Sequence, residues 1–147
     1  MNGPTRGERN HNPLNINYIA PPQMPFLGQV GVEVVPAGET YHPRFGLYSS
    51  DLLGIRAGAK ELISYITRDG CNTVTKIIDR WAPPSDDNPT TAYVDNVCKS
   101  TGFSPTETLA PDAADLAPLI RAMICQENGR CLYPDPLITQ AVALALT

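Results

Sequence analysis

The sequence predicts a mostly α-helical protein that folds as a single domain. Beyond residue 50, apolar residues recur every three or four positions in several segments, which is the spacing of one helix face. The first third is instead rich in proline, glycine and asparagine, which favour loops and turns. A chain of 147 residues can bury a core of its own. We therefore expect residues 1–147 to form one helical domain with a loop-rich amino-terminal third.

Within that first third the apolar runs are short. Residues 29–35 and 44–47 are the clearest of them, and we expect loops there with at most a small β-hairpin. The first helix signal follows Ser50, a suitable N-cap, and runs to Gly70, a residue type that often ends helices. Its apolar positions lie at helical spacing: Leu52, Leu53, Ile55, Ala59, Leu62, Ile63 and Ile66.

Four shorter helices are predicted in the remainder of the chain. The first must end before two consecutive prolines, and the second opens with an Asn-Pro pair that is typical of a helix start. The third carries an apolar face as far as a glutamate and is followed by glycine. In order, the expected segments are residues 73–81, 88–102, 116–127 and 135–146.

The bulk composition excludes two classes of function. A net charge of −4 with scattered basic residues does not provide the clustered Lys/Arg surface that nucleic acids need. The longest apolar runs fall well short of the roughly 20 residues of a membrane span, so we expect a soluble protein without membrane insertion. Met1–Arg9 lacks the basic-then-apolar order of a secretory signal, so we expect no signal peptide in this stretch.

The four cysteines raise the questions of metal binding and disulfide formation. None shows the close spacing of a zinc site, so we expect no metal and no other cofactor. If all four are oxidised, three pairings are open. Local spacing favours Cys125 with Cys131, and therefore Cys71 with Cys98, if the protein works in an oxidising periplasm. Buried free thiols are the alternative.

Glu127 is the carboxylate whose sequence position best suits acid catalysis. It ends an apolar helix, in the segment AMICQENG (residues 122–129), so its carboxyl should emerge from a buried element where the chain turns. Partial burial and the negative end of the helix dipole both raise a carboxyl pKa, as a general acid near neutral pH requires. The alternative is a solvated residue in the last turn of a helix.

Two polar segments suit a ligand, although each has a structural alternative. The asparagines of residues 9–16 suit sugar hydroxyls and N-acetyl groups, and equally suit turns that fold the loop on itself. Trp81 suits either a sugar-binding groove or the core, and Asp86 follows it in a segment expected to be a solvated loop. Glu8 and Glu39 are the other loop carboxylates that could serve as a second acid or base.

Five segments, read in order, resemble a family of phage virion-associated proteins. In that family the corresponding stretches look like RNNNPGNI, a phenylalanine-containing segment before a helix, G-x-NT, WAPP, and a helix that ends in E-N-G. Leu14, His11 and Glu8 depart from the family pattern in the amino-terminal loop. The segments here are RNHNPLNI (residues 9–16), FGLYSS (45–50), DGCNTV (69–74), WAPP (81–84) and QENG (126–129).

This resemblance implies a lysozyme-like fold with a rearranged order of elements. The family includes proteins akin to the lytic enzyme of enveloped double-stranded RNA phages, which is itself similar to lytic transglycosylases. In many lysozyme-like glucosaminidases a helix ending in Glu-Ser-Gly precedes the loop and an F-x-x-Y-x-S segment. Here the Glu-Asn-Gly helix comes last, which implies a circular permutation. Termini that lie close together would make such a permutation inexpensive.

The resemblance also implies an enzyme and a substrate. It implies cleavage of the β-1,4 bond between N-acetylmuramic acid and N-acetylglucosamine in peptidoglycan, by a monomeric lytic transglycosylase or muramidase with Glu127 as its acid. A hydrolase would add a second carboxylate, for which Glu8, Glu39 and Asp86 are the candidates. The residues expected to line the saccharide cleft are Asn10, Asn12, Asn15, Tyr48 and Tyr133.

The implied setting is a phage virion or the host periplasm, where the protein would help a phage to penetrate or lyse the cell wall, with other virion proteins as further partners. Two other functions remain open. One is a peptidoglycan endopeptidase, although the sequence has no metal site, reactive Cys/His pair or serine elbow that would support it. The other is a non-catalytic virion structural or wall-binding protein.

Overall fold

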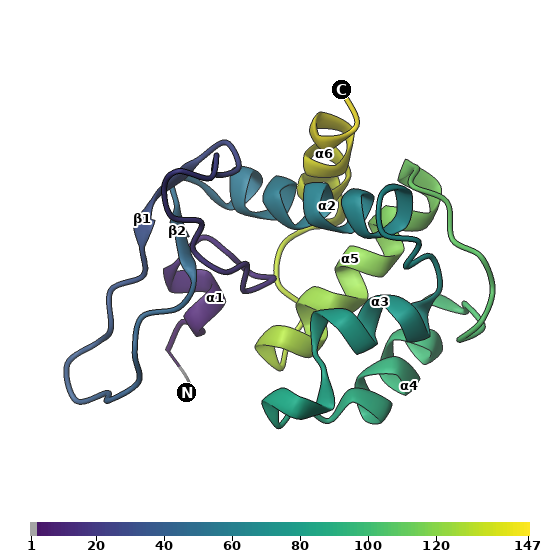
Figure 1. Ribbon diagram of the computed structural model, residues 1–147, viewed down its shortest axis with the longest axis horizontal. Coiled ribbons are helices and arrows are strands. Elements are labelled where there is room, and N and C mark those ends of the chain that lie inside the picture. Colours follow the sequence, from purple (N-terminus) through teal and green to yellow (C-terminus); the bar gives the residue numbers. More distant parts are fainter. Residues whose placement is uncertain (1–2) are drawn as a thin grey trace.

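The computed structural model describes residues 3–147, which contain six α-helices and a two-stranded sheet (Figure 1). The prediction of a mostly helical protein with a small hairpin is confirmed, while the first two residues of the expected amino-terminal loop lie outside the described residues. The elements are α1 (Arg6–Arg9), β1 (Gln29–Val32), β2 (Gly46–Tyr48), α2 (Asp51–Thr67), α3 (Val74–Trp81), a 3-10 turn (Pro84–Asp86), α4 (Thr90–Thr101), α5 (Ala113–Asn128) and α6 (Asp135–Ala145).

Local capping explains where most of these helices begin. The Ser50 hydroxyl accepts a hydrogen bond from the Leu53 amide at 3.2 Å, and Thr73 caps α3 in the same way. The helix expected from the Asn-Pro pair begins later, at Thr90, because the Asn88 side chain does not cap it. That side chain instead donates to the Pro83 carbonyl at 3.1 Å.

Helix α1 lies in a segment for which only loops were expected. Its start is a capping box, in which the Glu8 amide donates to the Thr5 hydroxyl at 3.1 Å and the Thr5 amide donates to the Glu8 carboxylate at 2.8 Å. The sequence signal for this motif, threonine followed three positions later by glutamate, is present, but α1 is too short for apolar periodicity to reveal it.

The core forms where α2 packs against α5 and α6. Helix α2 runs across the molecule in Figure 1, with α6 against it and α5 beneath, while α3 and α4 complete the helical side. The hairpin and α1 lie at the opposite side, where β2 contacts α2. Among residues 3–147, no helix is both long and apolar enough to cross a membrane. The centre of the core includes Ile55, Leu62, Leu119, Met123 and Ile138, all fully buried.

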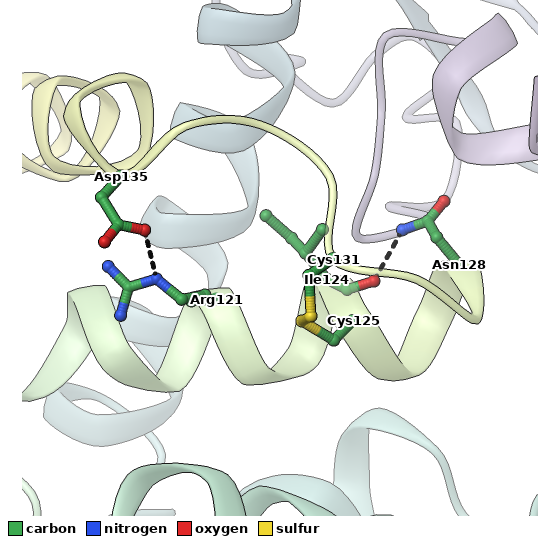
Figure 2. The surroundings of a disulfide bond; sticks show 6 residues. All are labelled: Arg121, Ile124, Cys125, Asn128, Cys131 and Asp135. Carbon is green, nitrogen blue, oxygen red and sulfur yellow. Dashed lines mark hydrogen bonds and ion pairs between the residues drawn. A yellow bond between two sulfur atoms is a disulfide. The ribbon is translucent and has the colours of Figure 1, made fainter.

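The end of α5 is fixed by a disulfide. Figure 2 shows Cys125 bonded to Cys131 in the loop that follows, as the local spacing predicted, and nearby Arg121 pairs with Asp135 at 2.7 Å. The second half of the pairing was wrong, because Cys71 and Cys98 are free thiols. The pairing of Cys71 with Cys98 was expected only if all four cysteines were oxidised. Each of these two side chains is instead a half-buried thiol that packs against the core.

Two glycines let the amino-terminal loop approach α2 closely. A Cβ atom at Gly54 would lie 1.7 Å from the His11 carbonyl oxygen, and one at Gly58 would lie 2.2 Å from the Leu14 side chain. Both distances are shorter than any side chain tolerates. The absence of a side chain at these two glycines in the first half of α2 therefore allows the amino-terminal loop to lie directly against the helix.

The two ends of the fold lie on different sides of α2. In Figure 1, α1 lies below α2 and the end of α6 lies above it. Helix α6 packs against α2, and the circular permutation that the resemblance implies stays a prediction.

Glu33 joins the amino-terminal loop to the hairpin. Its carboxylate accepts two hydrogen bonds from Arg6, at 2.8 and 2.6 Å, and one from Asn10 at 3.2 Å. The backbone amides of Arg44 and Phe45 each donate a further bond at 2.8 Å. Burial by itself raises the pKa of Glu33, but these donors outweigh burial and lower the pKa to about 2.

This network predicts an acid-sensitive fold. Because the pKa of Glu33 is lower in the folded state, its stabilisation is complete above about pH 4.5 and is lost as the pH falls toward 2, by about 3 kcal/mol. Chemical denaturation of wild type between pH 7 and 2 should show this loss. In Glu33→Gln the loss of unfolding free energy between pH 7 and 2 should be smaller than in wild type. Glu39→Gln, at an exposed site in the same hairpin, should show the same loss as wild type. An unchanged pH dependence in Glu33→Gln would contradict the assignment.

Candidate functional site

A groove of about 480 Å³ separates the amino-terminal loop from α2. Three side chains at successive turns of α2 form much of one wall, with Trp81 of α3 beside them. The opposite wall comes from the loop that follows α1 and from Arg44, which lies just before β2. The lining residues are Glu61, Tyr65, Arg68 and Trp81 on the helical side, and Asn15, Ile16, Asn17, Ile19, Gln23, Met24 and Arg44 on the loop side.

Glu127 lies next to this groove, behind Asn15. It is half-buried in the last turn of α5. The Asn15 amide donates to one carboxylate oxygen at 2.9 Å, and the Tyr93 hydroxyl donates to the other at 2.9 Å. Burial raises the pKa of Glu127, while the two donors and the charge of Arg44 lower it in part. The net effect is a raised pKa, in the direction expected for an acid at a buried helix end.

Asn15 connects Glu127 to the groove. It lines the groove and adopts a left-handed backbone conformation, with φ of +54°, which asparagine tolerates better than most residues. Its side-chain oxygen is buried and has no hydrogen-bond partner within residues 3–147. Such an acceptor is costly to leave unpaired, so a donor that enters beside Asn15 would be favoured.

The other two predicted asparagines are part of the fold and do not face the groove. Asn12 is fully buried, and its side chain bonds to the backbone of Ile16 and to the Gly46 carbonyl, each at 2.9 Å. Asn10 is 3% exposed and donates to Glu33. These contacts correspond to the alternative considered for this segment, in which asparagines fold the loop on itself.

The two predicted tyrosines also lie away from the groove surface. Tyr48 is 1% exposed, and burial with the charge of Glu61 raises its pKa to about 12. Its hydroxyl is buried without a partner in the described part of the chain. Tyr133 is half-buried with its hydroxyl 3.5 Å from Asp51, at the start of α2. Neither side chain is among those that line the groove.

None of the three predicted second carboxylates lines the groove. Glu8 is engaged by the Thr5 amide and by Arg130, which lower its pKa. Glu39 is exposed in the turn of the hairpin. Asp86 is exposed and reaches the edge of the groove only through an ion pair with Arg44 at 3.8 Å. All three were candidates because their segments were expected to be loops, whereas the carboxylate that lines the groove lies in the middle of a helix.

That carboxylate is Glu61, which the sequence analysis missed. Glu61, Tyr65 and Arg68 are spaced four and three positions apart, so they share one face of α2. A polar face at this spacing also describes an ordinary solvated helix face, which is why the sequence alone did not single it out. Trp81 packs against the core, with its ring edge-on to Tyr65 at 5.7 Å, and it also lines the groove. A role of Trp81 in sugar binding stays a prediction.

Comparison with known proteins identifies a phage family. No family model matches the chain. The chain is 33% identical over 133 residues to Protein P5 of Pseudoalteromonas phage PM2, an alignment that covers 90% of this chain and 77% of that protein. The chain therefore belongs to the family of this phage protein. The expected relationship to phage proteins is confirmed, and the expected lytic activity stays a prediction because the name of the relative states no activity.

The contacts around Glu127 predict how its pKa responds to substitution. Tyr93→Phe removes one of the two donors that stabilise the carboxylate, so the pKa of Glu127 should rise further. The change can be followed by carbon-13 NMR of the glutamate side-chain carboxyls during a pH titration. Tyr18→Phe, at a partly exposed tyrosine outside the groove, is the matched control and should leave the value unchanged. A fall in the pKa of Glu127 in Tyr93→Phe would contradict the arrangement.

Proposed function

We propose that the protein cleaves peptidoglycan at the β-1,4 bond between N-acetylmuramic acid and N-acetylglucosamine, on a lysozyme-like helical domain, with Glu127 as the general acid. The observation that carries the proposal is the placement of this carboxyl. It is half-buried at the end of α5, its pKa is raised, and it bonds to a residue that lines the groove. A raised pKa increases the fraction of a carboxyl that keeps its proton at a given pH, and the protonated form can donate that proton to the oxygen of a glycosidic bond.

Asn15 and Tyr93 orient this acid. Both oxygens of Glu127 are held by hydrogen bonds of 2.9 Å, so the carboxyl has one orientation, and one of the two donors, Asn15, lines the groove. The hydroxyl of Tyr93 can also accept a hydrogen bond, so it can stay paired when Glu127 is protonated. A substrate that displaces the Asn15 amide from Glu127 would expose the acid to the glycosidic oxygen, and its own polar groups would replace the lost bond.

The composition of the groove suits a glycan. Trp81 provides aromatic surface against which a sugar ring can pack, with the buried Tyr65 ring supporting it from below. Asn17 and Gln23 offer both donors and acceptors to hydroxyl and N-acetyl groups. Arg44 and Arg68 are largely exposed at the groove, where they suit the carboxylates of muramic acid and its peptide. The groove therefore combines the stacking and hydrogen-bonding groups that a peptidoglycan strand requires.

Two reaction courses start from the same acid. In a lytic transglycosylase, Glu127 would protonate the leaving oxygen and then accept the proton of the muramoyl C6 hydroxyl, which gives a 1,6-anhydro sugar. In a hydrolase, water would attack the anomeric carbon with help from a second carboxylate. Membership of a phage protein family supports a use in penetrating or lysing the host wall, from the virion or from the periplasm.

A wall-binding virion protein without catalysis is the second candidate. One observation favours it: Glu127 lies behind Asn15 and does not itself line the groove. In that case the groove would hold a glycan strand, and the bonds of Asn15 and Tyr93 to Glu127 would only stabilise the wall of the groove. Binding to peptidoglycan without any bond cleavage would distinguish this function from the enzymatic one.

Mass spectrometry of digested peptidoglycan tests the proposal. Wild type should release glycan fragments, and Glu127→Gln, which keeps the size and removes the acid, should cleave roughly 100 to 10,000 times more slowly. Glu39→Gln is the control for an exposed carboxylate and should retain full activity. Cleaved peptide cross-links would indicate an endopeptidase. Equal cleavage by wild type and Glu127→Gln would refute the role of Glu127, and intact peptidoglycan from wild type would favour the wall-binding function.

A further inference from the structure

Glu61 is an acidic side chain in the groove to which the reaction above assigns no role. It lies in the middle of α2, one turn before Tyr65 and two turns before Arg68, and all three line the groove. The side chain is half-buried. Glu61 lines the groove itself from α2, whereas Glu127 of α5 contacts the groove lining through its hydrogen bond with Asn15.

The carboxyl of Glu61 is not engaged by the fold. Among residues 3–147 it forms no hydrogen bond or ion pair, whereas the carboxylates of Glu33 and Glu127 each accept several. The two nearby cations are already paired, since Arg68 and Arg80 bind Asp69 at 3.1 and 2.8 Å. An acidic side chain that is half-buried and unpaired gains nothing for stability, and such groups are frequent at functional sites.

The surroundings of Glu61 make it a stronger base than an exposed glutamate. Burial raises its pKa, the charges of Arg68 and Arg80 lower it in part, and Asp69 raises it. Two buried phenols, Tyr48 and Tyr65, are also close enough to be affected by its charge. A base whose pKa is shifted toward neutrality accepts a proton from water more readily than an ordinary carboxylate does.

We propose that Glu61 is the catalytic base of a hydrolytic reaction in this groove, an inference that rests on the proposed glycosidic cleavage and selects one of its two courses. Glu127 gives its proton to the glycosidic oxygen as the bond from that oxygen to the anomeric carbon breaks. The oxygen of a water molecule forms the new bond to the anomeric carbon, and the proton that it loses goes to Glu61. The product is a reducing sugar with inverted anomeric configuration.

Digestion of peptidoglycan in water enriched in oxygen-18 tests this assignment. Wild type should give reducing ends that carry one heavy oxygen atom. Glu61→Gln should lose roughly 100-fold to 10,000-fold in rate while still sedimenting with peptidoglycan. Glu39→Gln is the matched control and should retain the wild-type rate and products.

Chemical rescue separates catalysis from a structural role. Glu61→Ala leaves space beside the anomeric carbon, and added azide should then attack that carbon and yield a glycosyl azide. Anhydro sugars without heavy oxygen from wild type, a normal rate in Glu61→Gln, or lost activity that azide does not restore in Glu61→Ala would each overturn the role of Glu61. Absence of any cleavage by wild type would refute the proposed function itself, and with it this assignment.

Discussion

The close approach of the amino-terminal loop to α2 is the constraint on which the candidate site depends. The loop carries Asn15, which lines the groove and donates a hydrogen bond to Glu127. The position of the loop therefore determines both the shape of the groove and the orientation of the Glu127 carboxyl. Gly54 and Gly58 permit this approach because a Cβ atom at either would overlap the loop. The Asn128 amide secures the same loop from α5, by a bond to the Pro13 carbonyl at 2.9 Å.

Three glutamates show how the environment of a carboxyl decides its role. Glu33 is buried with five donors around it, so it stays ionised and stabilises the fold. Glu127 is half-buried with two donors, and the effect of burial exceeds theirs, so its pKa is raised. Glu61 is half-buried with no donor among the described residues, so burial again raises its pKa. The number of donors therefore separates a structural carboxylate, whose pKa is lowered, from two carboxyls whose pKa is raised.

The helices could be predicted from the sequence because their signals are local. The cap at Ser50, the apolar spacing of α2 and the short separation of Cys125 from Cys131 each depend on residues a few positions apart. The role of Asn10 could not be predicted in this way, because its partner Glu33 is 23 positions away. Nothing near either residue in the sequence indicates that they meet.

The candidate site was predictable only in part, for the same reason. Glu127 could be found from its place at the end of an apolar helix, and Asn15 from the polar loop that carries it. Tyr93 and Glu61 lie within helices and become part of the site only when α4 and α2 pack beside the loop and α5. Sequence periodicity shows which face of a helix is apolar, but it does not show which polar residues border a groove.

A crystal structure of Glu127→Gln with a bound peptidoglycan tetrasaccharide would test the central claim most directly. The arrangement predicts that the glycan lies between the amino-terminal loop and α2, with a sugar ring against Trp81 and Glu61 at the opposite side of the scissile bond from residue 127. It also predicts that the Asn15 side chain moves away from residue 127 to admit the glycosidic oxygen. A glycan bound elsewhere, or one whose glycosidic bonds all lie out of reach of residue 127, would contradict it.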